Sequence, residues 1–235
     1  MKTADLKRNL KSRVAIVVPA YNEEKAIGNV LSSLKRAGYK QILVVDDGST
    51  DSTSVIAEKH GAILLRHLIN RGLGGALATG IKGALKLTDA SVIVTFDADG
   101  QHAVEDIERL VKPIFNGDAD VVIGSRLINP KGMPLLRRIG NWELNVLTFL
   151  LFGRMVTDSQ SGLRAFSRKA AAQLEITSNR MEVSSEIIGR ITEKKLRLKE
   201  VPIRAIYTDY SLSKGQSIFN GFRIIFKLLI KWITS

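Results

Sequence analysis

Two acidic residues separated by one position, Asp97 and Asp99, follow an apolar run of the sequence, and Gln101 stands two positions further on. In an extended chain, residues two apart point to the same side, so these carboxylates would repel each other unless a cation lay between them. Oxygen ligands favour a hard cation such as Mg²⁺ or Mn²⁺, which keeps water and substrate phosphates in its shell, and Gln101 could orient one of these. An isolated pair of this kind would more often cap a helix.

Polar clusters end three other apolar runs, at residues 19–24, 46–51 and 124–126. In a parallel α/β sheet the carboxyl ends of the strands meet at one edge, where ligands bind. Four polar clusters would therefore converge, which favours a ligand site over a helix cap at Asp97 and Asp99. Two consecutive acids, Asp46 and Asp47, exceed the single acceptor that a cap requires, so they could also accept from a ribose or a base.

A glycine-rich stretch at residues 70–75 precedes an expected helix. Its glycines could let the backbone approach a phosphate at the start of that helix. A tight turn with close helix packing explains the same glycines almost as well. The sequence leaves both interpretations of this stretch open.

Apolar runs and segments of helical periodicity alternate through the first half of the chain. Strands are predicted at residues 14–18, 42–45, 62–65, 91–96 and 120–124, and helices at residues 26–34, 52–60, 73–87 and 107–115. Continuous apolar strands separated by helices indicate an α/β fold with a mostly parallel sheet covered on both faces. Beyond Arg126 the pattern loosens, with an apolar helix predicted at 142–152 and one more strand at 200–206.

The chain has 235 residues, of which 45% are hydrophobic, with 35 Lys and Arg against 23 Asp and Glu and no Cys. The apolar content excludes a disordered chain, and the lack of Cys excludes a disulfide scaffold, a zinc–thiolate site and a Cys nucleophile. The net charge of +12 indicates an anionic partner, such as a phosphorylated substrate, an anionic membrane or nucleic acid. Nucleic acid is disfavoured because only 6% of the residues are aromatic and the strongest motifs are acidic.

The two ends of the chain differ from its middle. Residues 1–12 form a basic extension without the apolar core of a secretory signal, and no apolar stretch suits a conventional spanning helix. We expect one domain over residues 13–216. Residues 217–235 are predicted to form an amphipathic helix, whose three cations recur every four residues from Arg223 to Lys231. Such a helix would lie on an anionic membrane or on a membrane-spanning partner subunit, in preference to packing on the domain.

The motifs occur in an order that resembles a known family. They are residues 19–24, 46–51, 70–80, 97–102, 124–126 and 161–164. Together they resemble glycosyltransferase family 2, and within it the branch of dolichyl-phosphate mannose synthase and other polyprenyl-phosphate glycosyltransferases, over residues 13–214. The resemblance implies a GT-A, Rossmann-like nucleotide-sugar-binding fold, a nucleotide-sugar donor, Mg²⁺ or Mn²⁺ as cofactor, and inversion at the anomeric carbon. The chain departs from the family in having Leu163 where Phe is usual, and in having no C-terminal transmembrane helices.

The resemblance also implies roles for single residues. Catalytic roles would fall to Asp97, Asp99 and Arg126. The metal would be held by Asp97, Asp99 and Gln101, and the nucleotide sugar by Pro19, Tyr21, Glu23, Asp47 and Asp97. The acceptor or donor phosphates would be held by Arg126, by one of the pair Arg137 and Arg138, and by Lys214.

The implied reaction moves a sugar from GDP-mannose or a UDP-hexose to a polyprenyl phosphate, with the enzyme peripheral on the cytoplasmic face of a membrane. A phosphate monoester is largely dianionic at neutral pH, so it needs positioning cations and no dedicated general base. A sugar hydroxyl or another soluble acceptor is the alternative, and it would need a carboxylate base. The candidates for that base are Asp158, Glu182 and Glu186, each of which also fits a structural role.

Three further alternatives concern the apolar run after residue 138, the class of enzyme, and whether the chain is catalytically active. The basic pair at 137–138 leads into an apolar run that could lie against an isoprenoid chain or form an ordinary core helix. A nucleotidyltransferase would share the fold, but the chain lacks the basic glycine-rich loop that such an enzyme needs after its first strand. A catalytically inactive scaffold is disfavoured because Asp97, Asp99 and Gln101 are all present.

Overall fold

The computed structural model describes residues 10–130, 133, 135–204 and 206, with the backbone alone at 135–137. Strands and helices alternate through the first half of this range, as the sequence predicts. In chain order the elements are β1 (Val14–Ala20), α2 (Ile27–Arg36), β2 (Gln41–Asp46), α3 (Thr53–Lys59), β3 (Ile63–Arg66), α4 (Leu73–Leu87), β4 (Val92–Thr95), α5 (Asp106–Phe115), β5 (Val121–Ser125), α6 (Leu135–Phe152), β6 (Arg164–Ser167), α7 (Arg168–Gln173), α8 (Val183–Glu193) and β7 (Leu198–Pro202).

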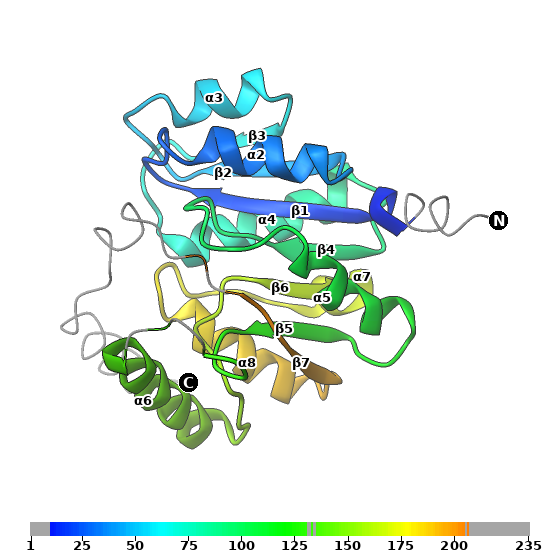
Figure 1. Cartoon of the computed structure of the whole chain (residues 1–235), viewed down its shortest axis with the longest axis vertical. Coiled ribbons are helices and arrows are strands. Elements are labelled where there is room, and N and C mark those ends of the chain that lie inside the picture. The colour runs from blue at the N-terminus through cyan, green and yellow to red at the C-terminus, as the bar shows by residue number, and fades with distance from the viewer. Residues whose placement is uncertain (1–9, 131–132, 134, 205, 207–235) are drawn as a thin grey trace.

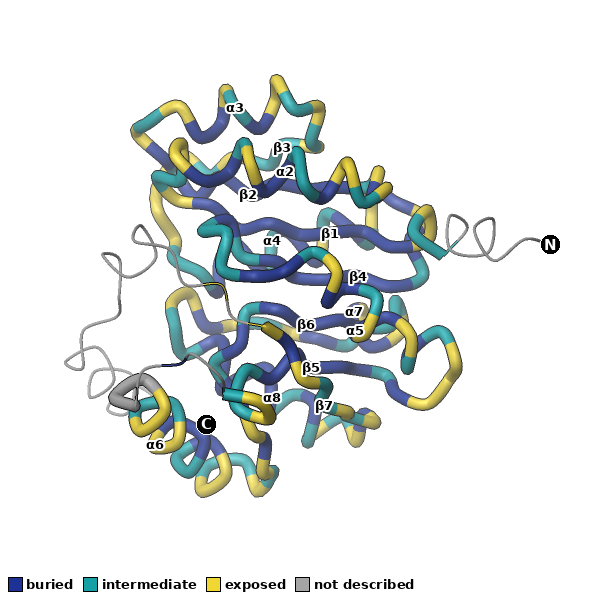
Figure 2. The backbone as a smooth tube through the Cα atoms, in the orientation of Figure 1, coloured by how far each residue is buried: buried dark blue, intermediate teal, exposed yellow. Residues whose placement is uncertain are grey.

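The strands form one seven-stranded sheet in the order β3-β2-β1-β4-β6-β5-β7 (Figure 1). β6 runs antiparallel to both of its neighbours, whereas the other pairings in this sheet are parallel. Every residue of β1 and of β4 is buried, as the dark central strands of Figure 2 show. Burial on both faces explains why these strands are continuously apolar, and the prediction of a mostly parallel sheet is confirmed.

Helices cover both faces of the sheet and divide the core into two layers. Ile16 of β1 belongs to the layer under α2, α3 and α5, while its neighbour Val17 belongs to the layer under α4, α7 and α8. Successive strand residues point to opposite faces, so each layer receives alternate side chains. Gly38 adopts a φ of +95° just beyond α2, a left-handed conformation that glycine tolerates at the end of a helix.

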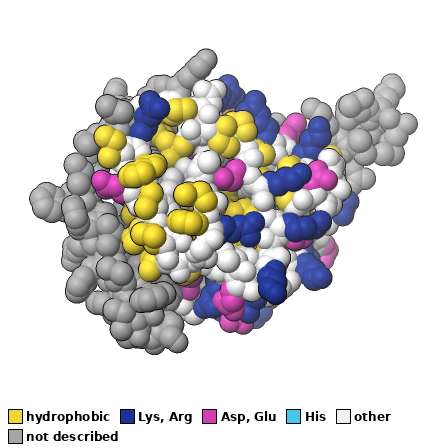
Figure 3. Space-filling model, turned by 90° about the horizontal axis from the view of Figure 1, so that it is seen from below, with side chains coloured by type: hydrophobic (Ala, Val, Ile, Leu, Met, Phe, Trp, Pro, Cys, Tyr) yellow, Lys and Arg dark blue, Asp and Glu magenta, His cyan; other side chains and the backbone are white. Residues whose placement is uncertain are grey.

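Helix α6 lies apart from the sheet and packs on α8. It contains the apolar helix predicted at 142–152 and begins earlier, at Leu135. Trp142 and Leu150 of this helix are exposed, and apolar side chains gather on the face of the molecule on which α6 lies (Figure 3). Within the described ranges, no helix is both long and apolar enough to cross a membrane.

The sequence pattern does not predict β6, α7 or α8. β6 has four residues and begins with the buried Arg164, so neither its length nor its polarity marks a strand. Its antiparallel direction is equally invisible in the sequence, because it follows from pairing with β4 and β5.

The last strand and the two chain ends differ from the sequence expectations in their bounds. The strand predicted at 200–206 begins earlier, and β7 ends at Pro202. The chain then leaves the ladder, because the backbone N–H of Arg204 donates to the Asp106 carboxylate at 2.8 Å. The helix predicted at 217–235 lies outside the described residues, as does most of the N-terminal extension.

Candidate active site

The polar clusters that follow β1, β2, β4 and β5 lie along one edge of the sheet, as predicted. The first two clusters are also joined by hydrogen bonds. The backbone N–H of Asn22 donates to Ser49 Oγ at 2.9 Å, and the N–H of Thr50 donates to Asn22 Oδ1 at 2.9 Å. The N–H of Glu23 donates to Thr53 Oγ1 at 2.8 Å. The loops after β1 and β2 are therefore bonded to each other and together form one wall of the site at this edge of the sheet.

The residues predicted to bind the nucleotide sugar lie on this wall with different exposure. Pro19 is buried in β1, Tyr21 is exposed, and Glu23 is partly exposed. Asp47 is buried, and its carboxylate already accepts three hydrogen bonds from the protein. The donors are His67 Nδ1 at 2.6 Å and the backbone N–H groups of Arg71 and Gly72 at 2.9 and 2.7 Å. Asp47 thus holds the loop between β3 and α4 in place beside the site.

Asp46 is occupied in the same way. Its carboxylate accepts from the backbone N–H of Ser49 at 2.9 Å and from the hydroxyl of Ser54, and it pairs with Arg66 at 3.3 Å. Both consecutive acids are therefore engaged by donors of the protein, and their shared effect is to order the loops around the edge.

The glycine-rich stretch before α4 packs tightly against the loop before α8. A Cβ on Gly74 would collide with the carbonyl oxygen of Ser178, and a Cβ on Gly72 would lie 2.6 Å from the carbonyl oxygen of Asn179. The N–H of Gly75 donates to that Asn179 oxygen at 3.1 Å. Of the two interpretations that the sequence leaves open, close packing is the one that these contacts support.

The acidic pair lies on a turn after β4, and the expectation of an extended chain here is wrong. The turn is closed by Gln101, whose backbone N–H donates to Asp99 Oδ1 at 2.9 Å and whose side-chain amide donates to Oδ2. His102 Nε2 donates to Asp97 Oδ2 at 2.9 Å. Gly162 leaves room for the Asp97 carboxylate, since a Cβ there would overlap it. The structure thus brings the three predicted metal-site residues together, with Gln101 placed as the partner of Asp99.

The pKa values of the two acids move in opposite directions. Burial acts to raise the pKa of Asp97, but the hydrogen bond and charge of His102 and the charges of Arg126 and Arg164 outweigh it and lower this pKa. Burial and the neighbouring charge of Asp97 raise the pKa of Asp99. Of the two carboxylates, Asp99 is therefore the one whose ionised form is disfavoured, and a cation beside it would relieve the repulsion between them.

The two carboxylates fit a hard divalent cation. Both offer oxygen ligands, and about a third of the Asp97 side chain is exposed (34%). Among the described residues, no group of three or more His, Asp or Glu side chains could hold a metal. Two protein carboxylates would leave most of the coordination shell to water and to substrate oxygens, which is how Mg²⁺ is commonly held in phosphate-transfer sites.

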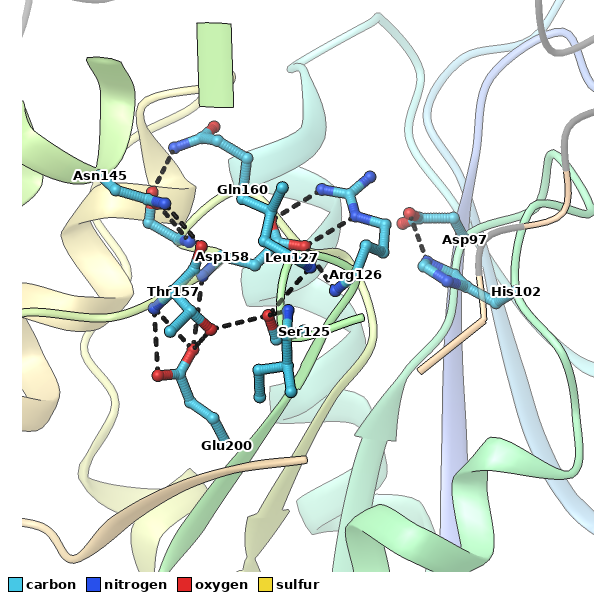
Figure 4. Close-up of polar contacts among 12 residues, drawn as sticks. Asp97, His102, Ser125, Arg126, Leu127, Asn145, Thr157, Asp158, Gln160 and Glu200 are labelled. Carbon is cyan, nitrogen blue, oxygen red and sulfur yellow. Dashed lines mark hydrogen bonds and ion pairs between the residues drawn. The ribbon is translucent and has the colours of Figure 1, made fainter. Parts of the chain in front are cut away.

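Arg126 and Asp158 form a bidentate ion pair at the end of β5 (Figure 4). Arg126 Nε donates to Asp158 Oδ2 at 2.8 Å and Nη2 donates to Oδ1 at 2.9 Å, while the backbone N–H of Arg126 adds a bond of 3.0 Å. Asp158 is fully buried, and Figure 4 shows Arg126 lying between it and Asp97. The pair therefore holds a cation close to the acidic turn.

Two of the three base candidates predicted for a hydroxyl acceptor hold structural positions. Asp158 is taken up by Arg126. Glu186 is buried in α8 and accepts from the backbone N–H groups of Thr177 and Ser178 at 3.1 and 2.8 Å. Glu182 is the N-cap residue of α8. Asp158 and Glu186 are thus engaged by donors of the protein rather than presented to a substrate.

Arg138 is the phosphate-binding candidate on α6 whose side chain is described. It is exposed and lines an apolar cavity of about 470 Å³ together with Trp142, Thr157 and Leu127, the residue after Arg126. The side chain of Arg137 and all of Lys214 lie outside the described residues. The structure therefore places Arg138 on the same cavity as Leu127, the residue after Arg126, and leaves the other two as predictions.

Sequence reasoning gives no role to two side chains of this centre, His102 and Arg164. His102 stands inside the recognised acidic motif, which is the signal that could have identified it. Arg164 is 1% exposed, and its Nη2 donates to the Ser159 carbonyl oxygen at 2.9 Å. Burial lowers the pKa of Arg164 to about 10, against the opposing charges of Asp97 and Asp158. A buried cation thus interacts with both Asp97 and Asp158. Arg164 ends the motif at residues 161–164, which is the signal that could have identified it.

Comparisons with known proteins agree with this geometry. Residues 15–174 match the sequence model of the family described as Glycosyl transferase family 2. The chain is 43% identical over 239 residues to the UDP-N-acetylglucosamine–dolichyl-phosphate N-acetylglucosaminyltransferase of Methanococcus voltae, covering 92% of this chain and 95% of the relative. It is 29% identical over 226 residues to the undecaprenyl-phosphate mannosyltransferase of Micrococcus luteus, covering 88% of this chain and 92% of the relative.

A solved structure shares the fold. Glucosyl-3-phosphoglycerate synthase from Mycobacterium tuberculosis, crystallised with Mn²⁺, uridine diphosphate and phosphoglyceric acid, superposes with a TM-score of 0.73 at 21% identity. The match covers 99% of this chain and 83% of that one. The mostly parallel sheet with polar clusters at one edge is accordingly the GT-A, Rossmann-like fold. The chain belongs to glycosyltransferase family 2 and is a glycosyltransferase with homologues among the polyprenyl-phosphate glycosyltransferases.

Proposed function

We propose that this enzyme transfers a sugar, with inversion, from a nucleoside-diphosphate sugar to the phosphate of a dolichyl-type polyprenol. The observation that supports this most directly is the pair of Arg126 and Asp158. It keeps a cation beside Asp97 and takes up Asp158, one of the carboxylates that could serve a hydroxyl acceptor as its base. A phosphate dianion is nucleophilic at neutral pH, so a cation that orients it is sufficient.

On the donor side, Asp97 and Asp99 would hold Mg²⁺ or Mn²⁺, which when bound neutralises the charge that develops on the leaving diphosphate. Gln101 and His102 keep the two carboxylates oriented through the hydrogen bonds they donate. The nucleotide would lie along the wall that carries Pro19, Tyr21, Glu23 and Asp47. Donor binding thus falls to the ends of β1, β2 and β4.

On the acceptor side, Arg126 would orient the lipid phosphate, with Arg138 meeting it from α6. An oxygen of this phosphate forms the new bond to the anomeric carbon as the bond from that carbon to the diphosphate breaks. Because the attacking oxygen carries no proton that must be removed, the arginines bind and orient without acting as bases. Arg137 and Lys214 stay candidates for this role on the resemblance alone.

We propose UDP-N-acetylglucosamine as the first donor to test, because the relative named for that donor is 43% identical over nearly the whole chain. GDP-mannose and UDP-glucose are the competing donors, and the more distant Micrococcus luteus relative is named a mannosyltransferase. The divergence between these relatives makes the donor a question for direct assay.

We also propose that the enzyme works peripherally on the cytoplasmic face of a membrane. The exposed side chains of Trp142 and Leu150, with the net charge of +12, suit an anionic membrane surface. The helix predicted at 217–235 would add a second contact or dock on a membrane-spanning partner subunit. Leu150→Ser should weaken binding to anionic vesicles about tenfold, while Leu87→Ser, at an exposed leucine on α4, should not. Equal binding by both variants would contradict the role of α6.

The reaction itself is tested with the purified protein, Mn²⁺ or Mg²⁺, a panel of UDP- and GDP-sugars, and a short-chain polyprenyl phosphate. A glycolipid detected by mass spectrometry with one donor would support the proposal and name the sugar. Parallel reactions offer a soluble sugar acceptor in place of the lipid. Product with the soluble acceptor and none with the lipid would overturn the proposed acceptor.

A further inference from the structure

The loop that carries Asp158 is held from two sides. Asn145 of α6 donates through Nδ2 to the Thr157 carbonyl oxygen at 2.6 Å, and its Oδ1 accepts from the backbone N–H of Ser159 at 2.8 Å (Figure 4). From β7, Glu200 accepts from the backbone N–H of Thr157 at 2.8 Å and from its hydroxyl at 2.7 Å. Thr157 and Ser159, the two neighbours of Asp158, are thus held in place, and so is the Asp158 carboxylate that pairs with Arg126.

Asn145 is suited to this task by its chemistry. An amide side chain donates and accepts at the same time, which Asp, Ala or Leu cannot do in the same space. Asn145 is 5% exposed, so the hydrogen bonds that it makes are shielded from water. Removing the amide would leave the Thr157 oxygen and the Ser159 N–H without these partners in a buried setting, which is costly.

Asn145 and Arg138 lie on the same helix, so the hydrogen bonds of Asn145 also bear on the position of Arg138. The two residues are seven positions apart on α6, which is two helical turns, so they lie on the same side of the helix. Both line the apolar cavity, which is also lined by Leu127, next to Arg126, and by Thr157. One amide therefore ties the helix that carries Arg138 to the loop that positions Arg126.

We propose that Asn145 is a positioning residue, which sets the spacing between Arg126 and Arg138 and thereby the affinity for the phosphate of the acceptor. This inference rests on the proposed function, because it assumes that the acceptor ends in a phosphate. Loss of the amide is expected to weaken binding of a polyprenyl phosphate about tenfold and to raise its KM by a similar factor. The KM for the nucleotide sugar should stay unchanged, because the donor wall lies on other elements.

Thr148 provides a matched control on the same helix. It is fully buried one turn further on, donates to the Leu144 carbonyl oxygen at 2.7 Å, and contacts Ser185 Oγ of α8 at 2.9 Å. Thr148→Val removes a buried polar tether of α6 without touching residues 157–159. It should lower the melting temperature and leave acceptor binding as it is.

The experiment compares the full chain, Asn145→Ala, Asn145→Asp and Thr148→Val for binding to vesicles that carry a short-chain polyprenyl phosphate or the same polyprenol without its phosphate. Asn145→Asp keeps the size of the side chain and the acceptor for Ser159, and melting curves establish that each variant is folded. The expected result is a loss by both Asn145 variants, about tenfold for Asn145→Ala, for the phosphate lipid alone. Acceptor KM measurements with the same variants should follow this loss.

Two other results would overturn the inference, and they are distinguishable. An equal loss for both lipids, or an equal loss in Thr148→Val, would reduce Asn145 to a packing residue while the proposed function stood. If the unsubstituted protein showed no preference for the phosphate lipid, the proposed acceptor would fail, and the role of Asn145 with it.

Discussion

The proposed donor half of the site centres on the acidic turn after β4, and the proposed acceptor half centres on the cationic pair after β5. The two centres are built from contacts of different range. The acidic turn is closed by neighbours in sequence, from Asp97 to His102 and from Asp99 to Gln101. At the end of β5, the cationic half is closed by residues far apart, such as Arg126 with its partner Asp158, 32 positions away. Short-range contacts leave a motif in the sequence, whereas long-range contacts leave none.

The two halves also differ in how their charges are balanced. The donor half places Asp99 beside a second acid, and the neighbouring charge helps to raise its pKa. The acceptor half neutralises its buried acid with a bidentate arginine. Substitutions in the acidic turn should therefore reduce activity and spare stability, while substitutions in the Arg126–Asp158 pair should reduce both.

The largest effect is expected from Asp99→Asn. Removal of this carboxylate should lower the transfer rate about a thousandfold, because the proposed divalent cation would lose one of the two carboxylates proposed to hold it. The melting temperature of the metal-free protein should stay the same or rise, because the repulsion between Asp97 and Asp99 disappears. Rates at saturating Mn²⁺ and melting curves with a chelator measure these two quantities.

A control for this substitution is Asp118→Asn. Asp118 is exposed and pairs with Lys199 at the surface, so the same change of charge there should leave the rate unaltered. If Asp99→Asn instead destabilised the protein as much as a break in the acceptor half, the proposed difference between the halves would be wrong.

Asp158→Asn should have the next largest effect on activity and the largest effect on stability. The change removes the charge of a fully buried partner of Arg126, which is expected to lower the free energy of unfolding by about 3 kcal/mol. Acceptor KM should rise roughly a hundredfold as Arg126 loses its orientation. Urea denaturation and acceptor titrations provide the two measurements.

The chain offers a matched pair for this comparison. Asp120 accepts from Arg197 in the same bidentate manner, at 3.0 and 2.9 Å, but Arg197 is exposed. Asp120→Asn should therefore lower the free energy of unfolding by less than about 1 kcal/mol. Equal losses in the two variants would show that burial of Asp158 is not what makes its pair strong.

The sequence predicts the parts of the fold and site that local patterns encode. The buried strands and the acidic pair are both predicted, because runs of apolar residues and closely spaced acids are local features, but the turn that carries the pair is not. β6 is not predicted, because its four residues, which begin with the buried Arg164, do not look like a strand in the sequence. They form one by pairing with β4 on one side and β5 on the other. Asn145 and Glu200 were invisible for the same reason, because their partners at 157–159 lie 12 to 43 positions away.

The smallest predicted effect is a pH dependence that separates the two acids of the donor half. The raised pKa of Asp99 gives a contribution to stability that is present below the ordinary Asp pKa of about 4 and is lost as pH rises through the raised value. The lowered pKa of Asp97 gives the opposite contribution, present above about 4 and lost as pH falls through the lowered value.

The advantage in melting temperature of Asp99→Asn over the unsubstituted protein, measured with a chelator, should therefore be greatest at neutral pH and shrink toward pH of about 4. Mn²⁺ at neutral pH should stabilise the unsubstituted protein and not the variant, since only the former keeps both carboxylates. If the difference in melting temperature between the two proteins did not depend on pH, the charge of Asp97 would not disfavour ionisation of Asp99. The contrast between the halves would then rest on the acceptor side alone.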